Sequence, residues 1–367
     1  MTRVAPDIAR QTQYDRVAMR TRFRVWVRAA VTTTTLIAAT GVVGPRSSAH
    51  VRVSQVTWTT DVEPILRRRC AGCHVANGFG PMALDTYEDA RTWAKAIREE
   101  ILEQRMPPWP AARGFTSFGN DRSLSPLEIE LVTAWTDGAT PLGPPASAAP
   151  DADAKPSTHS PDLVLAMAAP HAVTAAVETF ELATHENADR WITGWEFRPG
   201  NRSLVEEAVL RAGETTLDRW TPPEGRVLYP PGVAQRLPSR SAVALELHYR
   251  KSAMPETDRS AVALYFGARP IRELRHRQFP CGTSAIDRDI DVIAVTPRAA
   301  AARESVEVVG RGRDGLVAPL AVVPRYQPAY PITYRFRTPV RLARRTAIEV
   351  RSTSPGCSTE LAFVAAH

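Results

Sequence analysis

The 367-residue sequence predicts a multidomain protein in which a small all-α domain, residues 50–143, precedes an all-β region, residues 161–367. Two observations predict this division. Apolar residues recur at helical spacing in the first segment, whereas short β-like runs between Pro and Gly fill the second. The β region is expected to be an antiparallel, jelly-roll-like β-sandwich. Residues 144–160 are rich in Pro and Ala and are interpreted as a semi-stiff linker.

Residues 1–49 have the layout of a secretory signal peptide. Eight arginines and two acidic residues give this segment six of the chain's seven net positive charges. Arg16 to Arg28 form a basic n-region, residues 29–43 an uncharged, mildly apolar stretch, and Ala49 lies at a small-residue cleavage point. The apolar stretch is shorter than the roughly 20 residues of a membrane-spanning helix, so cleavage is favoured and an uncleaved N-terminal anchor is the alternative.

Two expectations follow from this charge distribution. The protein is expected to be exported, either periplasmic or anchored in the membrane facing the periplasm, with membrane contact by the N-terminal segment only. Because the remainder of the chain is almost neutral, no nucleic-acid partner is expected.

Three helices are predicted in the first domain. The first begins with Thr60 or Asp61 as its N-cap and ends at Cys70. The second covers residues 85–105, where apolar side chains recur at helical spacing. The third covers residues 125–135 and begins with a capping box.

The strands of the β region are predicted from short apolar runs separated by turn residues. Little helix is expected there, with residues 203–211 as the one candidate. The runs that predict strands are "RWITGWEFRPG", "AVALELHYR", "AVALYFG", "DIDVIAVTP", "ESVEVVG", "YPITYRF", "TAIEVRS" and "ELAFVAA".

The stretch "CAGCH" predicts the covalent attachment of a c-type haem. Zinc would need a second pair of ligands at comparable spacing, and a thioredoxin-type dithiol would follow a strand, whereas the flanks here are helical. In the haem interpretation Cys70 and Cys73 form thioethers with the vinyl groups, and His74 is the proximal iron ligand. One haem c is therefore the expected cofactor.

The sixth iron ligand is predicted to be Met106, in the sequence "MPPW". Met82 follows His74 by only a few residues, which is hardly enough chain to reach the opposite face of the haem, so it is interpreted as core packing. Histidine and methionine together raise the iron potential and leave no open coordination position. Electron transfer to an unidentified redox partner protein is then the expected function, and no catalytic residue is predicted.

The two remaining cysteines, Cys281 and Cys357, have no partner except each other. In an exported protein they are expected to form a disulfide.

The chain resembles a family of exported bacterial proteins in which a mono-haem cytochrome c domain is fused to a region similar to copper type II, ascorbate-dependent monooxygenases of the peptidylglycine α-hydroxylating class. The cytochrome part is carried by "DVEPILRRRCAGCH", "MPPWP" and "AWTDGATPLG". The copper-monooxygenase-like part is carried by "SPDLVLAM", "DRWITGWEFRPGNRSLVEEAVL", "YPPGVAQRLP", "LELHYRKSAMPETDRSAVALYF" and "YPITYRFRTPVRLARRTAIEV".

The sequence departs from that family at the copper ligands. A histidine pair that binds one copper is replaced by Glu206 and Glu207, and the His-x-His of the second copper reads His248, Tyr249, Arg250. The family's methionine ligand near the C-terminus has no counterpart. Copper is therefore not expected: His248 is interpreted as a structural or surface residue, and the two glutamates as a solvated face.

The preferred function is an exported c-type cytochrome that transfers electrons, with an accessory β-sandwich that lacks functional copper sites. The alternative is a copper-dependent monooxygenase with an atypical copper site that the haem domain supplies with electrons. A third interpretation makes the sandwich a binding module and the haem a sensor.

Overall fold

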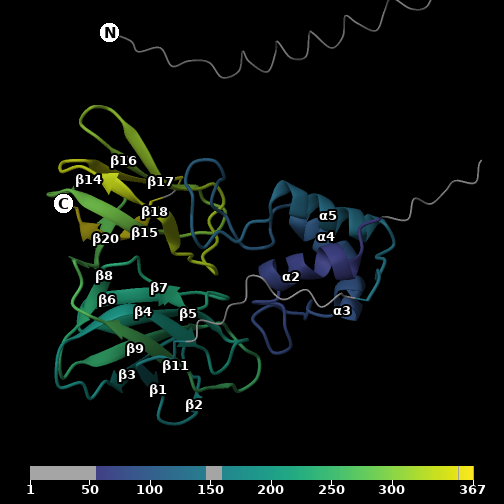
Figure 1. Ribbon diagram of the computed structural model, residues 1–367, viewed down its shortest axis with the longest axis horizontal. Coiled ribbons are helices and arrows are strands. Elements are labelled where there is room, and N and C mark those ends of the chain that lie inside the picture. Colours follow the sequence, from purple (N-terminus) through teal and green to yellow (C-terminus); the bar gives the residue numbers. More distant parts are fainter. Residues whose placement is uncertain (1–54, 146–158, 354, 367) are drawn as a thin grey trace, which may run out of the picture. The chain divides into compact units, whose positions relative to one another are not determined.

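The computed structural model describes residues 55–145, 159–353 and 355–366 (Figure 1). The predicted signal peptide or anchor, residues 1–49, and most of the predicted linker lie outside these ranges. Within them, no helix is both long enough and apolar enough to cross a bilayer.

The helices of the described chain are short and lie near its N-terminal end. A π-helical turn, η2, leads directly into the first α-helix, so helical structure begins before the predicted cap at Thr60. The predicted helix over residues 85–105 is two helices, because the backbone at Trp93 (φ −98°, ψ 8°) leaves the helical region. The capping box at Ser125 is confirmed. The elements are η2 Trp58–Val62, α2 Glu63–Arg69, α3 Tyr87–Thr92, α4 Ala94–Leu102 and α5 Pro126–Asp137.

Ten strands make the two main sheets of a first β-sandwich, whose sheets face each other across a core that includes Trp195, Leu210, Leu245 and Leu264. One sheet has the order β1-β11-β4-β8-β12, with β7 beside β4, and the other has the order β3-β9-β5-β6. Their bounds are β1 Leu163–Ala166, β3 Val177–Ala183, β4 Arg190–Arg198, β5 Val205–Ala212, β6 Thr215–Trp220, β7 Val227–Leu228, β8 Val233–Leu237, β9 Ala242–Tyr249, β11 Ala261–Gly267 and β12 Arg272–Glu273. A small separate sheet pairs β2 His171–Ala172 with β10 Thr257–Asp258.

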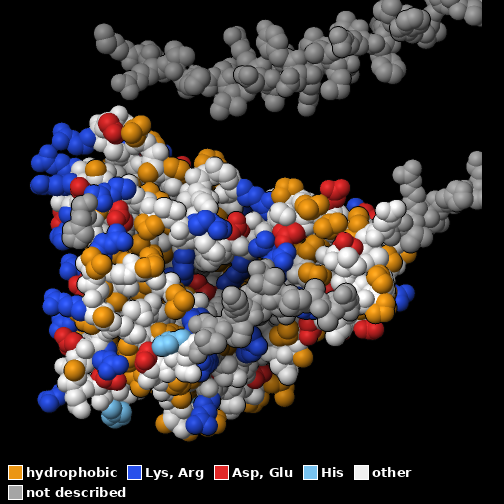
Figure 2. Space-filling view, in the orientation of Figure 1, with side chains coloured by type: hydrophobic (Ala, Val, Ile, Leu, Met, Phe, Trp, Pro, Cys, Tyr) orange, Lys and Arg blue, Asp and Glu red, His pale blue; other side chains and the backbone are white. Residues whose placement is uncertain are grey.

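A second β-sandwich follows, built from two four-stranded sheets around a core that includes Val292, Val308, Leu320 and Ile348. The sheet orders are β13-β20-β15-β18 and β14-β19-β16-β17. The bounds are β13 Arg275–Pro280, β14 Gly282–Ala285, β15 Ile290–Arg298, β16 Val306–Arg311, β17 Val317–Val323, β18 Tyr334–Leu342, β19 Ala347–Ser352 and β20 Ser358–Ala365. Basic and acidic side chains are interleaved over the β region on the face shown in Figure 2.

All eight sequence runs that predicted strands contribute to strands of these sandwiches. In β9, for example, every second residue is buried, as expected for a strand with one face on a core. The suggested helix over residues 203–211 is wrong. This segment forms β5, which is paired with β6 on one side and β9 on the other, and cross-strand pairing satisfies its backbone groups.

The predicted fold class, an all-α cytochrome c domain followed by one all-β region, is also wrong. Among the described residues the chain is mostly β-sheet, with four short α-helices and no separate all-α domain. After α4, the chain instead joins the second sandwich: Ala111 and Phe118 enter its core, and Phe118 pairs with Phe336 in a β-bridge. The helices pack on a small core of their own, which includes Trp58, Ile97 and Trp135.

The predicted disulfide between Cys281 and Cys357 is confirmed. The two Cα atoms are 5.0 Å apart, and the bond spans a sequence separation of 76 residues. It joins the segment between β13 and β14 to the segment between β19 and β20. In addition, the backbone N–H of Cys281 donates a hydrogen bond of 3.0 Å to the carbonyl oxygen of Cys357.

Candidate functional site

The predicted haem-attachment residues lie in one tight turn after α2. Helix α2 ends at Arg69, with Cys70 as its C-cap. The chain continues to turn because the backbone N–H groups of Cys73 and His74 both donate to the carbonyl oxygen of Cys70, at 3.0 and 2.9 Å. Two thiols and one imidazole are therefore brought together by local structure alone. Neither thiol is in a disulfide.

The imidazole of His74 is held in one orientation and one tautomer. Its Nδ1 lies 3.0 Å from the carbonyl oxygen of Met82. A carbonyl can only accept, so Nδ1 carries the proton and Nε2 keeps its lone pair. Gly80 packs against the ring, where a Cβ would lie 2.6 Å from Nδ1. Burial lowers the pKa of His74, although the bond to Met82 opposes this, so the ring is neutral at pH 7. This arrangement is typical of a histidine that ligates a metal.

The two thiols are protonated at neutral pH. The pKa of Cys70 is raised to about 12, mainly by burial and to a smaller extent by the neighbouring Cys73. Burial also raises the pKa of Cys73, although the cations of Arg122, Arg202 and Arg250 oppose it. Thiolates are the reactive and metal-binding form of cysteine, so either thiol would have to lose its proton in order to react.

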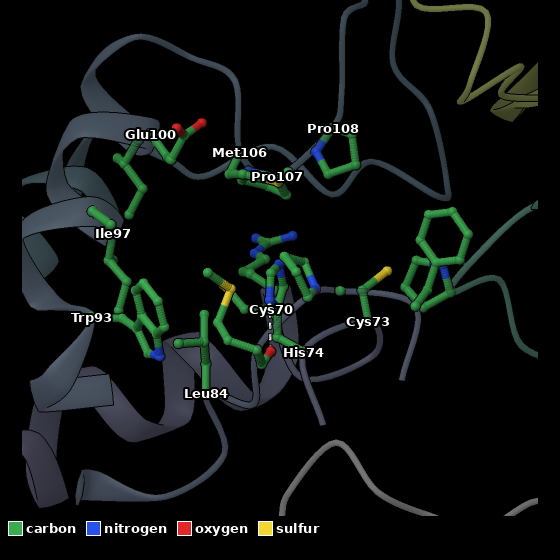
Figure 3. Close-up of a pocket in the computed structure, with 18 of the residues that line it drawn as sticks. Cys70, Cys73, His74, Leu84, Trp93, Ile97, Glu100, Met106, Pro107 and Pro108 are labelled. Atoms are coloured by element: carbon green, nitrogen blue, oxygen red, sulfur yellow. Dashed lines mark hydrogen bonds between the residues drawn. The ribbon is translucent and has the colours of Figure 1, made fainter. Parts of the chain in front are cut away.

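A cavity of about 410 Å³ opens beside this turn, a volume within the range of ligand pockets. Figure 3 shows that Met106 lies across it from His74, with Trp93 on one flank and Cys73 on the other. The cavity wall is mainly apolar. Its lining includes Cys70, Cys73, His74, Phe79, Met82, Leu84, Trp93, Ile97, Ile101, Met106, Pro107 and Pro108.

The two candidate methionines differ in their surroundings. Both line the cavity, but Met82 also packs against the helical core, and its carbonyl oxygen is bonded to His74. Met106 follows α4 and is held by a backbone hydrogen bond of 3.2 Å to Glu100. The assignment of Met106 as sixth ligand stays a prediction, and its place opposite His74 in Figure 3 suits that role.

The β region forms part of the cavity wall. The sequence did not predict this contribution. Pro223 follows β6, Arg250 follows β9, and Tyr330 precedes β18, yet all three line the cavity, as does Arg122 from the segment before α5. The CAGCH turn itself contacts the first sandwich, because Gly72 lies against Pro223. No sequence signal relates Pro223, Arg250 or Tyr330 to a motif that lies more than 100 positions away.

Two of the positions at which the similar proteins carry copper ligands, Glu207 and His248, lie among ion pairs. Glu207 is 3% exposed and pairs with Arg219 and Arg298, so it is not part of the predicted solvated face. His248 is Glu207's cross-strand neighbour and lies 2.9 Å from a carboxylate oxygen of Glu246. The described residues contain no group of three or more His, Cys, Asp or Glu side chains that could hold a metal ion.

The comparisons with known proteins add little. No protein-family model matches the chain, and no curated protein matches it. Among solved structures, the chain has a weak likeness to the major capsid protein P2 from bacteriophage PM2, with 11% identity over 55% of this chain and 97% of the capsid protein. The TM-score is 0.29, too low to support any inference about fold or function.

Proposed function

We propose that the protein is an exported c-type cytochrome that carries one covalent haem and transfers electrons. Cys70 and Cys73 would hold the haem through thioethers, and His74 and Met106 would be its axial ligands. The observation that carries this proposal is the state of His74: its Nδ1 donates to the Met82 carbonyl, which leaves Nε2 as the nitrogen available to a metal, beside two free thiols.

The residues that line the cavity fit such a group. The wall is apolar around Leu84, Ile97 and Ile101, as a porphyrin face requires, and a thioether lies across from the imidazole. When bound, the haem iron would supply one-electron oxidation and reduction. His74 and Met106 would hold the metal and leave no room on it for substrate, and the apolar wall would keep water from the group.

Export is part of the proposal. The basic segment Arg16 to Arg28 and the apolar stretch that follows support it, and c-type haem is attached outside the bacterial cytoplasm. The protein would then work in the periplasm, free or anchored there by its N-terminal segment, and exchange electrons with a partner protein.

The experiment is expression in a host that is competent for c-type haem maturation, followed by denaturing electrophoresis and intact mass measurement. A chain that carries one haem after denaturation, and that loses it on Cys70→Ala plus Cys73→Ala, is the expected result. Recovery of a stable, folded chain of unmodified mass, with both thiols open to alkylation, would overturn the proposal. His74→Ala removes the proposed imidazole ligand and should change the haem absorption spectrum, whereas the control His185→Ala, at a histidine outside the cavity, should not.

A further inference from the structure

The cavity beside the CAGCH turn carries an excess of positive charge. Three arginines line it, Arg69, Arg122 and Arg250, against one carboxylate, Glu100. Glu100 is already engaged by Arg105, which donates to both of its oxygens at 2.8 and 2.9 Å.

Arg69 has its own counter-charge. Its guanidinium donates to both carboxylate oxygens of Glu128, at 3.2 and 3.3 Å, and this pair ties α2 to the start of α5. Arg69 therefore adds little net charge to the cavity, and the excess rests on the other two arginines.

Arg250 is fixed in place by groups that do not neutralise it. Its guanidinium lies 3.8 Å from the centre of the Phe79 ring and donates a 3.0 Å hydrogen bond to the Phe79 carbonyl oxygen. Its backbone N–H is bonded to Leu204. The half-buried Glu206 acts on it electrostatically, but the two form no ion pair among the described residues.

Arg122 is likewise held by a group that does not neutralise its charge. It is half-buried, and one of its terminal nitrogens donates a 3.1 Å hydrogen bond to the carbonyl oxygen of Pro222. Glu224 attracts it at a distance but is bonded to Arg335. Within the described chain, Arg122 forms no ion pair of its own.

Two partly desolvated guanidinium groups without ion pairs are costly unless an anion joins them. A guanidinium fork matches a carboxylate in shape and donates two parallel hydrogen bonds to it. A haem carries two propionate carboxylates. The two guanidinium groups without an ion pair, those of Arg122 and Arg250, therefore equal in number the carboxylates to be bound.

We propose that Arg122 and Arg250 bind the two propionate carboxylates of the haem attached at Cys70 and Cys73. This inference rests on the proposed function. Arg250 comes from the first β-sandwich, so the β region is a structural part of the haem site and not merely an accessory. Both are positioning residues, and as fixed cations beside the haem they favour its reduced state and raise its potential.

The test is a redox titration of the haem-loaded protein and of the variants Arg122→Gln, Arg250→Gln and the double variant. Each single variant is expected to keep its covalent haem and its Met–iron absorption. The ratio of reduced to oxidised haem at a fixed potential should fall about three- to tenfold in each, and further in the double variant. Arg313→Gln removes the same charge from the exposed loop between β16 and β17 and controls for net charge.

Arg122→Lys and Arg250→Lys keep the charge but lose the fork, so they should restore most of the potential. They also provide folded samples where a Gln variant is unstable. A double Gln variant that titrates as the wild-type protein does, or a shift of equal size in Arg313→Gln, would overturn the inference. Absence of covalent haem from the wild-type chain would instead overturn the proposed function.

Discussion

Gly72, in the CAGCH turn, lies directly against Pro223, which follows β6 of the first sandwich. A Cβ at position 72 would be 2.5 Å from the Pro223 Cβ and 2.6 Å from its Cγ, closer than such atoms approach in proteins. Proline is a rigid ring and cannot rotate away. The absence of a side chain at Gly72 therefore allows the turn to contact the sandwich.

Gly72→Ala is expected to destabilise the protein by about 1–3 kcal/mol, the range for overpacking, and Gly72→Val by more. Haem attachment should persist because position 72 supplies no ligand and no thiol. Thermal unfolding followed by far-UV circular dichroism and haem absorbance measures the change. The matched control is Gly225→Ala in the nearby loop, where nothing lies within 4 Å of the added carbon. Equal melting temperatures for the two Ala variants would contradict the prediction.

Met106→Leu is expected to remove the Met–iron absorption feature and lower the midpoint potential, because a thioether ligand stabilises ferrous iron. Leucine keeps the volume, so the cavity should stay closed. Met82→Leu is the matched variant on the same cavity wall and should keep both properties. The two absorption spectra of the oxidised proteins decide the assignment, and a spectral loss confined to Met82→Leu would make Met82 the sixth ligand.

Copper is not expected to bind tightly at the positions that carry copper ligands in the similar family. Glu207 is held by two guanidinium groups, of Arg219 and Arg298, which repel a dication, and His248 contacts Glu246. Metal analysis after incubation with copper and dialysis should give one iron and no stoichiometric copper per chain. Stoichiometric copper that disappears in His248→Ala would favour the monooxygenase alternative.

Local pattern was sufficient for most single elements of this chain. The alternation in β9, the buried run of β15 and the capping box at Ser125 are set by nearest neighbours in the sequence, and each was predicted. The segment that forms β5 is the exception, since a helix was suggested there. Its strand form depends on β6 and β9, which pair with it from later in the chain.

The arrangement of those elements was harder to predict. Trp109 and Phe118 pack on Tyr334 of the second sandwich, although they lie in a segment assigned to a helical domain. Likewise, the CAGCH motif identified its own three residues, while Arg250 and Pro223 reach the same cavity only through sheet packing. Contacts between distant segments leave no periodic trace in a single sequence.

Loss of the Cys281–Cys357 disulfide is expected to destabilise the second sandwich by about 4 kcal/mol, because the bond closes a long loop in the unfolded chain. The measurement is thermal unfolding of the Cys281→Ser, Cys357→Ser double variant. The absorption spectrum of the haem should not change, since neither residue lines the cavity. A double variant that unfolds at the wild-type temperature, or two alkylatable thiols in the unreduced protein, would contradict the prediction.

Stability should fall in acid partly through Glu360, which lies between His276 and Arg219. Burial alone would raise the pKa of Glu360, but the hydrogen bond from His276 and the charge of Arg219 outweigh it and lower the pKa from 4.5 to about 2. The ionised carboxylate is therefore favoured by folding. Its contribution, about 3 kcal/mol, is present in full above pH 4.5 and is lost as the pH falls from about 4.5 towards 2.

Glu360→Gln removes this carboxylate and should flatten the dependence of unfolding free energy on pH in that window. The variant should be less stable than the wild-type protein at pH 7, because Arg219 loses a buried partner that joins β6 to β20, and the difference should narrow towards pH 3. Urea denaturation between pH 3 and pH 7 measures both effects. Glu214→Gln, in the exposed turn between β5 and β6, should keep the wild-type slope. Parallel curves for Glu360→Gln and wild type would show that Glu360 carries none of the acid sensitivity.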